Sequence, residues 1–430
     1  MSWLWHRPLE ARAFAATLLS AAAISGCWER TDESPGANAP GRALDSVVSG
    51  PSKAAAPVAT PAAVPAPGPA PAPEPNPSLV VVAGGDVNFG RECGQSILGD
   101  PNYDPFAKVA SLWADADLRF VNLESQLSDQ GGETQSPRHR LIFTGPPGGA
   151  DVLARAKIHV VSTANNHAWD YGRSALFETL ANLERAGVAN IGTGKDLSQA
   201  YRPAVFKLKG WSVAVFAVTH IWNYGPIAEH EGQKHVAWAR FDRFKAEFEK
   251  ARRENDVVLV SYHGGEEYID APVTRARDFV KTLMRAGADA FIGHHPHVPQ
   301  GVGWRGDKPV FYSLGNFVFA GHNDKPWTKF GFLAKLVFSR SANADSQSAI
   351  DVDVFACPYR LDGHVPLPLA GPDEAGASQS FHKHLRLIST SVGGSELGEP
   401  DALGCFRVSS PQRKNQKNER VASVSQPESL

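Results

Sequence analysis

ADAFIGHHPH, residues 288–297, is a short apolar run that ends in three neighbouring histidines. Short runs rich in Val, Ile and Phe, bounded by Gly and polar residues, are typical of buried strands. Five further runs end in the same way, in residues of the types that bind metals. They are residues 79–83, 118–121, 158–163, 257–262 and 310–314. Because ligands of open α/β sheets bind outside the carboxyl ends of the strands, these residues predict one site if the strands share a sheet.

Six side chains at these run ends are predicted to bind metal: Asp86, Glu124, Asn166, His263, His295 and His297. Carboxylate, amide and imidazole groups without thiolate suit Mn, Fe, Zn or Mg, so one or two divalent ions are expected. A single histidine is more often a structural residue, and the metal prediction therefore depends on all six positions together. Pro296 biases His295 toward an extended backbone, and a turn there would direct its ring and that of His297 toward different ions.

The loop NNHAWDYG, residues 165–172, combines several chemically active side chains. His167 is predicted to act as a general acid or to stabilise negative charge, with Asp170 orienting its imidazole. The alternative for this loop is a turn with a surface histidine. Six further side chains are predicted to support the ligands or to contact substrate: Asn88, Asn165, His294, Glu266, Glu267 and Asn316. For Glu266 and Glu267 the alternative is a solvated rim.

The composition is that of an ordinary globular protein. The 430 residues are enough for two average domains or for one large α/β domain, and a hydrophobic content of 42% supports a sizeable core. The formal net charge is −2, from 43 basic and 45 acidic residues. This balance argues against a nucleic-acid partner, which would favour a basic surface.

The N-terminal 26 residues are typical of a lipoprotein signal peptide. Arg7 and Arg12 precede a stretch of small apolar residues, 13–25, which is too short to span a bilayer comfortably. The sequence ISGC at residues 24–27 resembles the bacterial lipobox, which predicts lipidation of Cys27; the alternative is an ordinary signal with a chance cysteine. Residues 27–78 are rich in Pro and Ala and predict a disordered, semi-rigid linker. We therefore expect an exported protein, anchored by lipid to a membrane of the bacterial cell envelope.

Residues 79–408 are predicted to form the folded domain, followed by a disordered polar tail at 409–430. Besides Cys27 the chain has Cys93, Cys357 and Cys405. An odd number excludes a complete disulfide framework, but one pair is possible in an oxidising compartment. The sequence does not indicate which two cysteines would form it.

Helices and strands alternate along this domain, which predicts an α/β fold. Amphipathic helices are expected at residues 174–186, 240–253 and 272–286, with Ser174 as an N-cap and Pro272 in a first turn. Hairpins are expected at 205–208 with 211–218 and at 332–338 with 350–357, so the sheet is mixed or there are two packed sheets. The two glycines before Asp86 are expected to let the backbone turn sharply at a strand end.

Six motifs, taken in order, resemble those of the CapA family of bacterial capsule and poly-γ-glutamate synthesis proteins. They lie at residues 85–86, 122–124, 164–172, 263–268, 293–298 and 313–317. The resemblance spans about residues 79–390 and implies a four-layer α/β/β/α sandwich of metallophosphoesterase type with mixed sheets. It implies that one ion is held by Asp86 and His297, with Asn88 beside them. It further implies that Asn166, His263 and His295 hold a second ion, that Glu124 lies between the two, and that His167 is the catalytic imidazole.

Two motifs differ from those of related phosphoesterases. The phosphoesterase pattern Asp-x-His is replaced by DVN at 86–88, and Gly-Asp-x-x-Asp is replaced by NLE at 122–124. The loss of a His and an Asp weakens the case for two tightly held metals and for phosphoester hydrolysis as the native reaction. The resemblance instead implies a cell-surface, metal-dependent protein that helps to make or assemble an anionic capsule polymer such as poly-γ-glutamate, together with other capsule-synthesis proteins. The alternatives are a phosphoesterase, an enzyme that abstracts a peptide α-proton, and a non-catalytic scaffold of a polymer-export complex.

Overall fold

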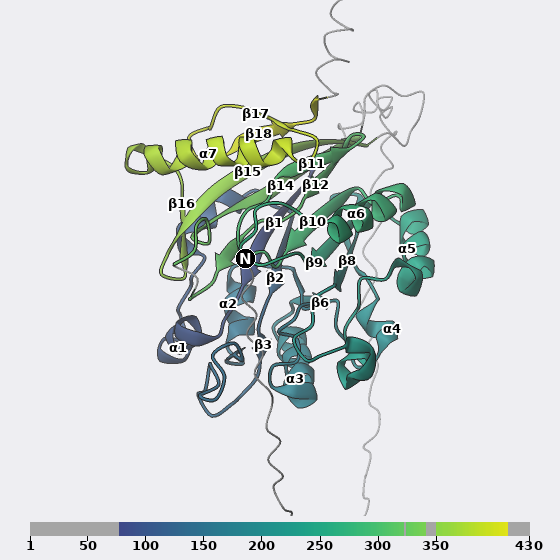
Figure 1. Cartoon of the computed structure of the whole chain (residues 1–430), viewed down its shortest axis with the longest axis vertical. Helices are drawn as coiled ribbons and strands as arrows, with labels where there is room; N and C mark the ends of the chain where they lie inside the picture. Colours follow the sequence, from purple (N-terminus) through teal and green to yellow (C-terminus); the bar gives the residue numbers. More distant parts are fainter. Residues whose placement is uncertain (1–76, 322–323, 341–349, 412–430) are drawn as a thin grey trace, which may run out of the picture. The chain divides into compact units, whose positions relative to one another are not determined.

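Two β-sheets pack face to face in the computed structural model, and helices cover the outer face of each sheet (Figure 1). The structure describes residues 77–321, 324–340 and 350–411, which belong to one compact unit, Pro71–Leu430. The larger sheet has ten strands, in the order β17-β18-β15-β14-β1-β2-β5-β6, with β13 beside β1 and β16 beside β15. The smaller sheet has six strands, in the order β11-β12-β10-β9-β8-β7.

The larger sheet consists of β1 (Leu79–Val87), β2 (Leu118–Leu123), β5 (Val160–Ser162), β6 (Ala189–Ile191), β13 (Asn316–Val318), β14 (Phe330–Arg340), β15 (Ile350–Asp362), β16 (Val365–Pro368), β17 (Glu396–Leu397) and β18 (Phe406–Ser409). The smaller sheet consists of β7 (Ala204–Leu208), β8 (Trp211–Thr219), β9 (Val257–His263), β10 (Ala290–His294), β11 (Val302–Arg305) and β12 (Lys308–Phe311). A separate pair is formed by β3 (Gln126–Leu127) and β4 (Thr144–Gly145).

The helices are α1 (Arg91–Gly99), α2 (Gly149–Arg155), α3 (Gly172–Arg185), α4 (Leu197–Ala200), α5 (Phe241–Glu254), α6 (Thr274–Ala286) and α7 (Ala375–Thr390). Four short 3₁₀ segments are η1 (Ala107–Trp113), η2 (Ile227–Glu229), η3 (Glu231–Lys234) and η4 (Pro372–Glu374).

The alternation of side chains along β1 shows how the layers are held together. Leu79 and Val81 point into a core shared with residues of the smaller sheet such as Leu259, whereas Val80 and Val82 join a second core on the opposite face. The second core also contains buried residues of α1, α2, α3 and η1. Because successive strand residues face opposite sides, one fully apolar strand can supply both cores.

The outer face of the smaller sheet is covered by α5 and α6. Phe216 of β8 packs on Phe244 and Phe248 of α5, with ring centroids 5.8 and 5.5 Å apart, and Leu283 of α6 joins the same core. Burial of one such phenylalanine contributes about 2–3 kcal/mol. The layers are therefore helix, sheet, sheet and helix, and the predicted α/β/β/α sandwich with mixed sheets is confirmed. At one end of the sandwich, α7 packs on the core between the sheets (Figure 1).

The six apolar runs do not share one sheet, contrary to the simplest expectation. β1, β2 and β5 are parallel neighbours in the larger sheet, and β9, β10 and β12 are parallel neighbours in the smaller one. The predicted hairpins are confirmed, as β7 with β8 and β14 with β15. The alternative of two packed sheets is therefore correct, and the strand ends meet across the interface between the sheets.

Two helix starts differ from the prediction. α3 begins at Gly172, after Tyr171, so Ser174 is already inside the helix and is not its N-cap. α6 begins at Thr274, and Pro272 precedes the first turn instead of lying within it. Arg277 Nε donates to the carbonyl oxygen of Pro272 (3.1 Å), a local contact beside the helix start.

The glycines beside the site serve a close approach of backbones and not a sharp turn. β1 continues through Gly85 and Asp86 to Val87, with an irregular register to β2 between Ala83 and Asp86. A Cβ at Gly85 would lie 1.9 Å from the carbonyl oxygen of Gly315, and one at Gly293 would lie 2.0 Å from that of Tyr312. Backbone atoms fill the space that any larger residue would need, so these two positions require glycine.

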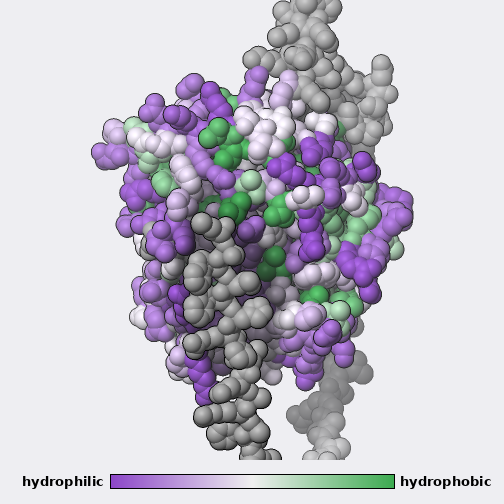
Figure 2. All heavy atoms as spheres, viewed as in Figure 1, coloured by the Kyte–Doolittle hydropathy of each residue, from purple (hydrophilic) through white to green (hydrophobic). Residues whose placement is uncertain are grey.

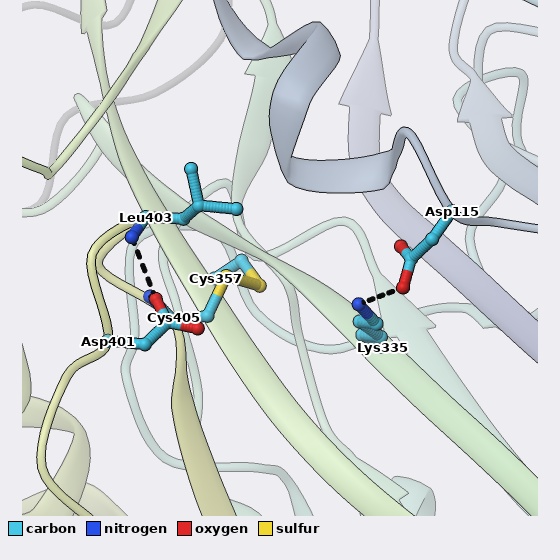
Figure 3. The surroundings of a disulfide bond; sticks show 6 residues. All are labelled: Asp115, Lys335, Cys357, Asp401, Leu403 and Cys405. Atoms are coloured by element: carbon cyan, nitrogen blue, oxygen red, sulfur yellow. Dashed lines mark hydrogen bonds and ion pairs between the residues drawn. A yellow bond between two sulfur atoms is a disulfide. The ribbon is translucent and has the colours of Figure 1, made fainter.

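A disulfide joins Cys357 of β15 to Cys405, which precedes β18 (Figure 3). Cys93 is a buried free thiol. The Asp401 carboxylate accepts hydrogen bonds from the amides of Leu403 and Cys405, both 2.9 Å long, and so shapes the turn that carries Cys405. The pairing that the sequence left open is thus decided by the fold, which places β18 beside β15.

The predicted signal peptide with Cys27 and residues 28–76 of the linker lie outside the described residues, as do residues 412–430 of the tail. Within the part that the structure describes, no helix combines the length and apolarity needed to cross a bilayer. The face seen in Figure 2 is mainly hydrophilic, with hydrophobic residues in small groups.

We predict that Gly85→Ala lowers the free energy of unfolding by about 2 kcal/mol or more, because the added methyl group must displace backbone. Urea unfolding followed by circular dichroism measures this change. Gly376→Ala is the matched control: nothing lies within 4 Å of a Cβ at that helical position, so stability should stay the same or rise slightly. Equal stability of the two variants would contradict the close approach at Gly85.

We predict that reduction of the disulfide lowers the free energy of unfolding by about 3 kcal/mol, because the bond closes a 48-residue segment. Thermal unfolding with and without a phosphine reductant measures the change, and a Cys357→Ala, Cys405→Ala variant should match the reduced protein. Cys93→Ala should keep the full response to reductant. A wild-type protein whose melting temperature ignores the reductant would show that the bond is absent.

Candidate metal centre

The carboxyl ends of strands from both sheets meet at one buried point. Asp86 lies near the end of β1, Glu124 directly follows β2, and His263 ends β9. The side-chain amide of Asn122 in β2 bridges the sheets: its Nδ2 lies 2.9 Å from Asp86 Oδ1 and 3.1 Å from His263 Nδ1. Parallel strands within each sheet, together with face-to-face packing, therefore bring these distant segments into contact.

Glu124 is at the centre of this cluster. Its side chain is fully buried, and neither carboxylate oxygen has a hydrogen-bond partner. The Nε2 atoms of His263 and His297 both lie 3.6 Å from Glu124 Oε1, and that of His167 lies 4.0 Å away. Burial, followed by the charge of Asp86, raises the pKa of Glu124 well above its ordinary value. A buried carboxylate without partners is costly unless a cation or a proton neutralises it.

Two groups of donors share Glu124. The first is Asp86, Glu124 and His297, and the second is Glu124, His263 and His295; within each group the donor atoms lie within 4.8 Å of one another. Asn166 Oδ1 lies 2.7 Å from His263 Nε2, so the amide joins the second group. These are the two sets that the family resemblance implied. All six residues are brought together, and their role as metal ligands stays a prediction.

Asp86 is held as an anion by its surroundings. Burial raises its pKa, but the close contact with His294 and the charges of His294 and His297 outweigh this effect, and the net pKa is lowered. His294 Nδ1 lies 3.3 Å from Asp86 Oδ1, and His297 Nδ1 lies 3.5 Å from Oδ2. The backbone amide of His295 donates to Oδ2 at 3.2 Å. His294 thus lies beside Asp86 and belongs to neither donor group that shares Glu124.

The backbone of His295 is not extended, contrary to the prediction. His295 and His297 have φ values of 97° and 57°, in the left-handed region that side chains rarely adopt. The bond from the His295 amide to Asp86 turns the chain away from the path of β10. The two rings then separate, with centroids 5.8 Å apart, and each joins a different group around Glu124.

The imidazoles of the second group are neutral. Burial, with the charge of His295 next in importance, lowers the pKa of His263 well below its ordinary value. Burial and the charge of His167 lower the pKa of His295 to about 3. A neutral ring leaves one nitrogen able to donate an electron pair, which is the form that binds metals.

His167 is oriented by a chain of contacts. Its Nδ1 lies 2.9 Å from Asp170 Oδ2, and the same oxygen accepts a hydrogen bond from the amide of Phe143 (2.9 Å). Tyr224 Oη donates to Asp170 Oδ1 at 2.8 Å, and the His167 ring stacks on Phe143 with centroids 4.1 Å apart. This arrangement leaves Nε2, the nitrogen nearer Glu124, for proton transfer.

Other predicted residues have supporting roles. Asn316 Oδ1 lies 2.9 Å from His297 Nδ1 and fixes that ring. Asn165 Nδ2 donates to the Leu123 carbonyl (2.8 Å), and Asn88 Oδ1 accepts from the Gly90 amide (2.7 Å), so both shape loops at the site. The amide oxygen of Asn88 has a second lone pair, so the expected place of Asn88 beside the ion stays a prediction.

Glu266 and Glu267 differ although they are neighbours. Both are exposed, but Glu267 forms a third donor group with His295 and His297, whereas Glu266 joins none. The solvated-rim alternative therefore fits Glu266 better than Glu267. A cavity of about 490 Å³ opens beside the cluster, within the range of small-ligand sites, and Glu267, Asn166 and His167 line it.

The sequence did not single out three residues that shape the site: Asn122, Tyr224 and Arg91. Asn122 was visible within its strand-end motif, and Arg91 follows Asp86 by five positions. Tyr224 lies in the irregular stretch between β8 and η2, where no strand end or motif marks it.

A comparison with known proteins shows the family of this chain. The family profile described as "Bacterial capsule synthesis protein PGA_cap" matches residues 80–321. The chain belongs to this family. The resemblance inferred from the six motifs is therefore confirmed, and the matched region of the PGA_cap protein includes every residue of the donor cluster.

Several relatives and solved structures are similar to this chain. The PGA biosynthesis protein CapA of Bacillus subtilis is 30% identical over 225 residues, which are 52% of this chain and 58% of the relative. The capsule biosynthesis protein CapA of Bacillus anthracis is 32% identical over 181 residues, 41% and 43% of the two chains. The match thus spans about half the length of these curated relatives. The NAD nucleotidase of Haemophilus influenzae is similar in structure, with a TM-score of 0.38 and 12% identity, over 71% of this chain and 62% of that one.

We predict that Glu124→Gln abolishes tight binding of divalent cations, because both donor groups lose the carboxylate that they share. Elemental analysis of purified protein measures the metal content. Addition of Mn²⁺ to metal-stripped protein should raise the melting temperature of the wild type and leave that of the variant unchanged.

Glu247→Gln, at an exposed position of α5, is the control and should keep the wild-type metal content. Metal content that is the same in Glu124→Gln and wild type would refute the assignment of this cluster.

Proposed function

We propose that this PGA_cap protein is a metal-dependent enzyme of the bacterial cell envelope that acts on an anionic capsule polymer, poly-γ-glutamate. The observation that carries the proposal is the buried, partnerless carboxylate of Glu124 among imidazoles, beside an open cavity. The relatives named for PGA and capsule biosynthesis supply the polymer class.

The donor cluster fits one or two divalent ions of Mn, Fe, Zn or Mg. Carboxylates and neutral imidazoles are ligands of hard and borderline cations, and Glu124 belongs to both groups. Such an ion, when bound, polarises a substrate oxygen and lowers the pKa of a coordinated water. Asp86 and His297 would hold one ion, and His263, His295 and Asn166 the other.

His167 is the candidate for proton transfer. Its ring is locked by Asp170 on one side and by stacking on Phe143, and it lines the cavity beside the donor cluster. Because Asp170 holds Nδ1, the opposite nitrogen is the one that can exchange a proton with a substrate. His167 belongs to no donor group, so its role is separable from cation binding.

The proposed location outside the cytoplasm is supported by the Cys357–Cys405 bond. Structural disulfides persist in oxidising compartments and are rare in the bacterial cytoplasm. Export through the N-terminal signal, with lipid attachment at Cys27, would place the domain at the membrane surface. Other capsule-synthesis proteins would then be its partners there.

We predict that His167→Asn lowers turnover about a hundredfold or more while metal content stays at the wild-type level, because proton transfer is lost without loss of a donor. The assays are capsule polymer per cell in a complemented deletion strain, and polymer length after incubation with purified, Mn²⁺-loaded protein.

His382→Asn, which alters a histidine on α7 that bonds to the Gly398 carbonyl, is the control and should retain full activity. Full polymer production by His167→Asn would favour a non-catalytic scaffold of the export machinery. Hydrolysis of an aryl phosphate at a comparable rate would favour the phosphoesterase alternative.

A further inference from the structure

The guanidinium of Arg91 lines the cavity beside the donor cluster. Arg91 is the first residue of α1 and follows Asp86 of β1 by five positions, so the connection from β1 to α1 brings this cation close to a predicted ligand. His167 and His297 line the same cavity of about 490 Å³. A substrate in this space would therefore reach the donor cluster and the guanidinium together.

The side chain of Arg91 is fixed by neutral groups. Nη1 donates to the carbonyl oxygen of Ala320 at 2.5 Å, and Nη2 donates to that of Arg140 at 3.4 Å. Its Cζ atom lies 4.8 Å from the ring centroid of Phe143 and 6.0 Å from that of Phe319. Ring faces and carbonyl oxygens orient a guanidinium without forming an ion pair with it.

No carboxylate among the described residues forms an ion pair with Arg91, and only two of its five donors are engaged. The acidic side chain among the cavity-lining residues is Glu267, whereas Arg91 and three histidines supply the basic groups. Lys325 lies nearby, with Nζ 5.9 Å from the Tyr268 ring centroid. The cavity is thus suited to an anion.

Backbone strain gathers around the same cavity. Arg91, Tyr268 and His297 have φ values of 55°, 66° and 57°, and they are three of the seven described non-glycine residues with positive φ. The Arg91 amide donates to the Thr134 carbonyl at 3.0 Å, which holds this backbone in place. Such strain persists only where surrounding contacts enforce it, and it clusters at sites that bind ligands.

We propose that Arg91 binds a carboxylate of an acidic peptide while the reacting group of that peptide lies at the donor cluster. This role of Arg91 rests on the proposed function, and it makes Arg91 the residue that selects the polymer substrate. A guanidinium matches a carboxylate with two parallel N–H···O bonds, which gives both affinity and orientation. Neighbouring glutamyl units of poly-γ-glutamate offer such a second carboxylate.

The test is isothermal titration of the metal-loaded full chain with a synthetic γ-glutamyl hexapeptide and, separately, with inorganic phosphate. Arg91→Met keeps most of the apolar stem and removes the charge; the dissociation constant for the peptide should rise about tenfold or more. Arg91→Lys keeps the charge without the fork and should give an intermediate value. Arg253→Met, at an exposed position of α5, is the control and should bind like the wild type.

Metal content and circular dichroism of each variant show whether the cluster and the fold are intact. Peptide binding by Arg91→Met and Arg91→Lys equal to that of the wild type would overturn the role of Arg91 and leave the proposed function standing. Absence of peptide binding by the wild type would overturn the proposed substrate itself, and the role of Arg91 with it. Binding of phosphate but not peptide, weakened in Arg91→Met, would overturn the carboxylate assignment.

Discussion

A carboxylate buried without hydrogen-bond partners is the constraint around which this site is organised. Glu124 lies where the carboxyl ends of strands from the two sheets meet. Imidazoles from three separate segments surround its Oε1. An ionised carboxylate in such a place is destabilising by several kcal/mol unless a positive charge accompanies it. Burial disfavours every charged form at this point: it raises the pKa of Glu124 and lowers the pKa of His263 and of His295. Bound cations would relieve it.

The rigidity of the surrounding fold keeps the donors in place. Backbones approach so closely at Gly85 and Gly293 that neither strand can carry a side chain there. The side-chain amide of Asn122 contacts Asp86 in one sheet and His263 in the other. The left-handed backbone at His295 and His297 directs their rings apart. Each of these features is unfavourable or restrictive by itself. Together with the three buried hydrophobic clusters, they hold the donor atoms in fixed positions.

The cavity combines three kinds of chemistry on one small surface. The donor cluster offers a site for cations, His167 offers an oriented imidazole, and Arg91 offers a positive charge held by rings and carbonyl oxygens. This combination is the basis for the proposed substrate, a polymer with repeated carboxylates, and the chain belongs to a capsule synthesis family. The disulfide between Cys357 and Cys405 supports the proposal that the protein acts outside the cytoplasm.

The sequence by itself determined which residues end the strands, the types of donor there and the layered α/β architecture, because these depend on local alternation and on turn residues. Only the tertiary structure decided that the strand ends belong to two sheets, that Cys357 pairs with Cys405, and that Tyr224 and Arg91 reach the cavity. It also decided the backbone of His295, since a hydrogen bond to Asp86, 209 residues away in the chain, outweighs the local preference for an extended conformation. Contacts between distant segments depend on how whole layers pack, which no local pattern encodes.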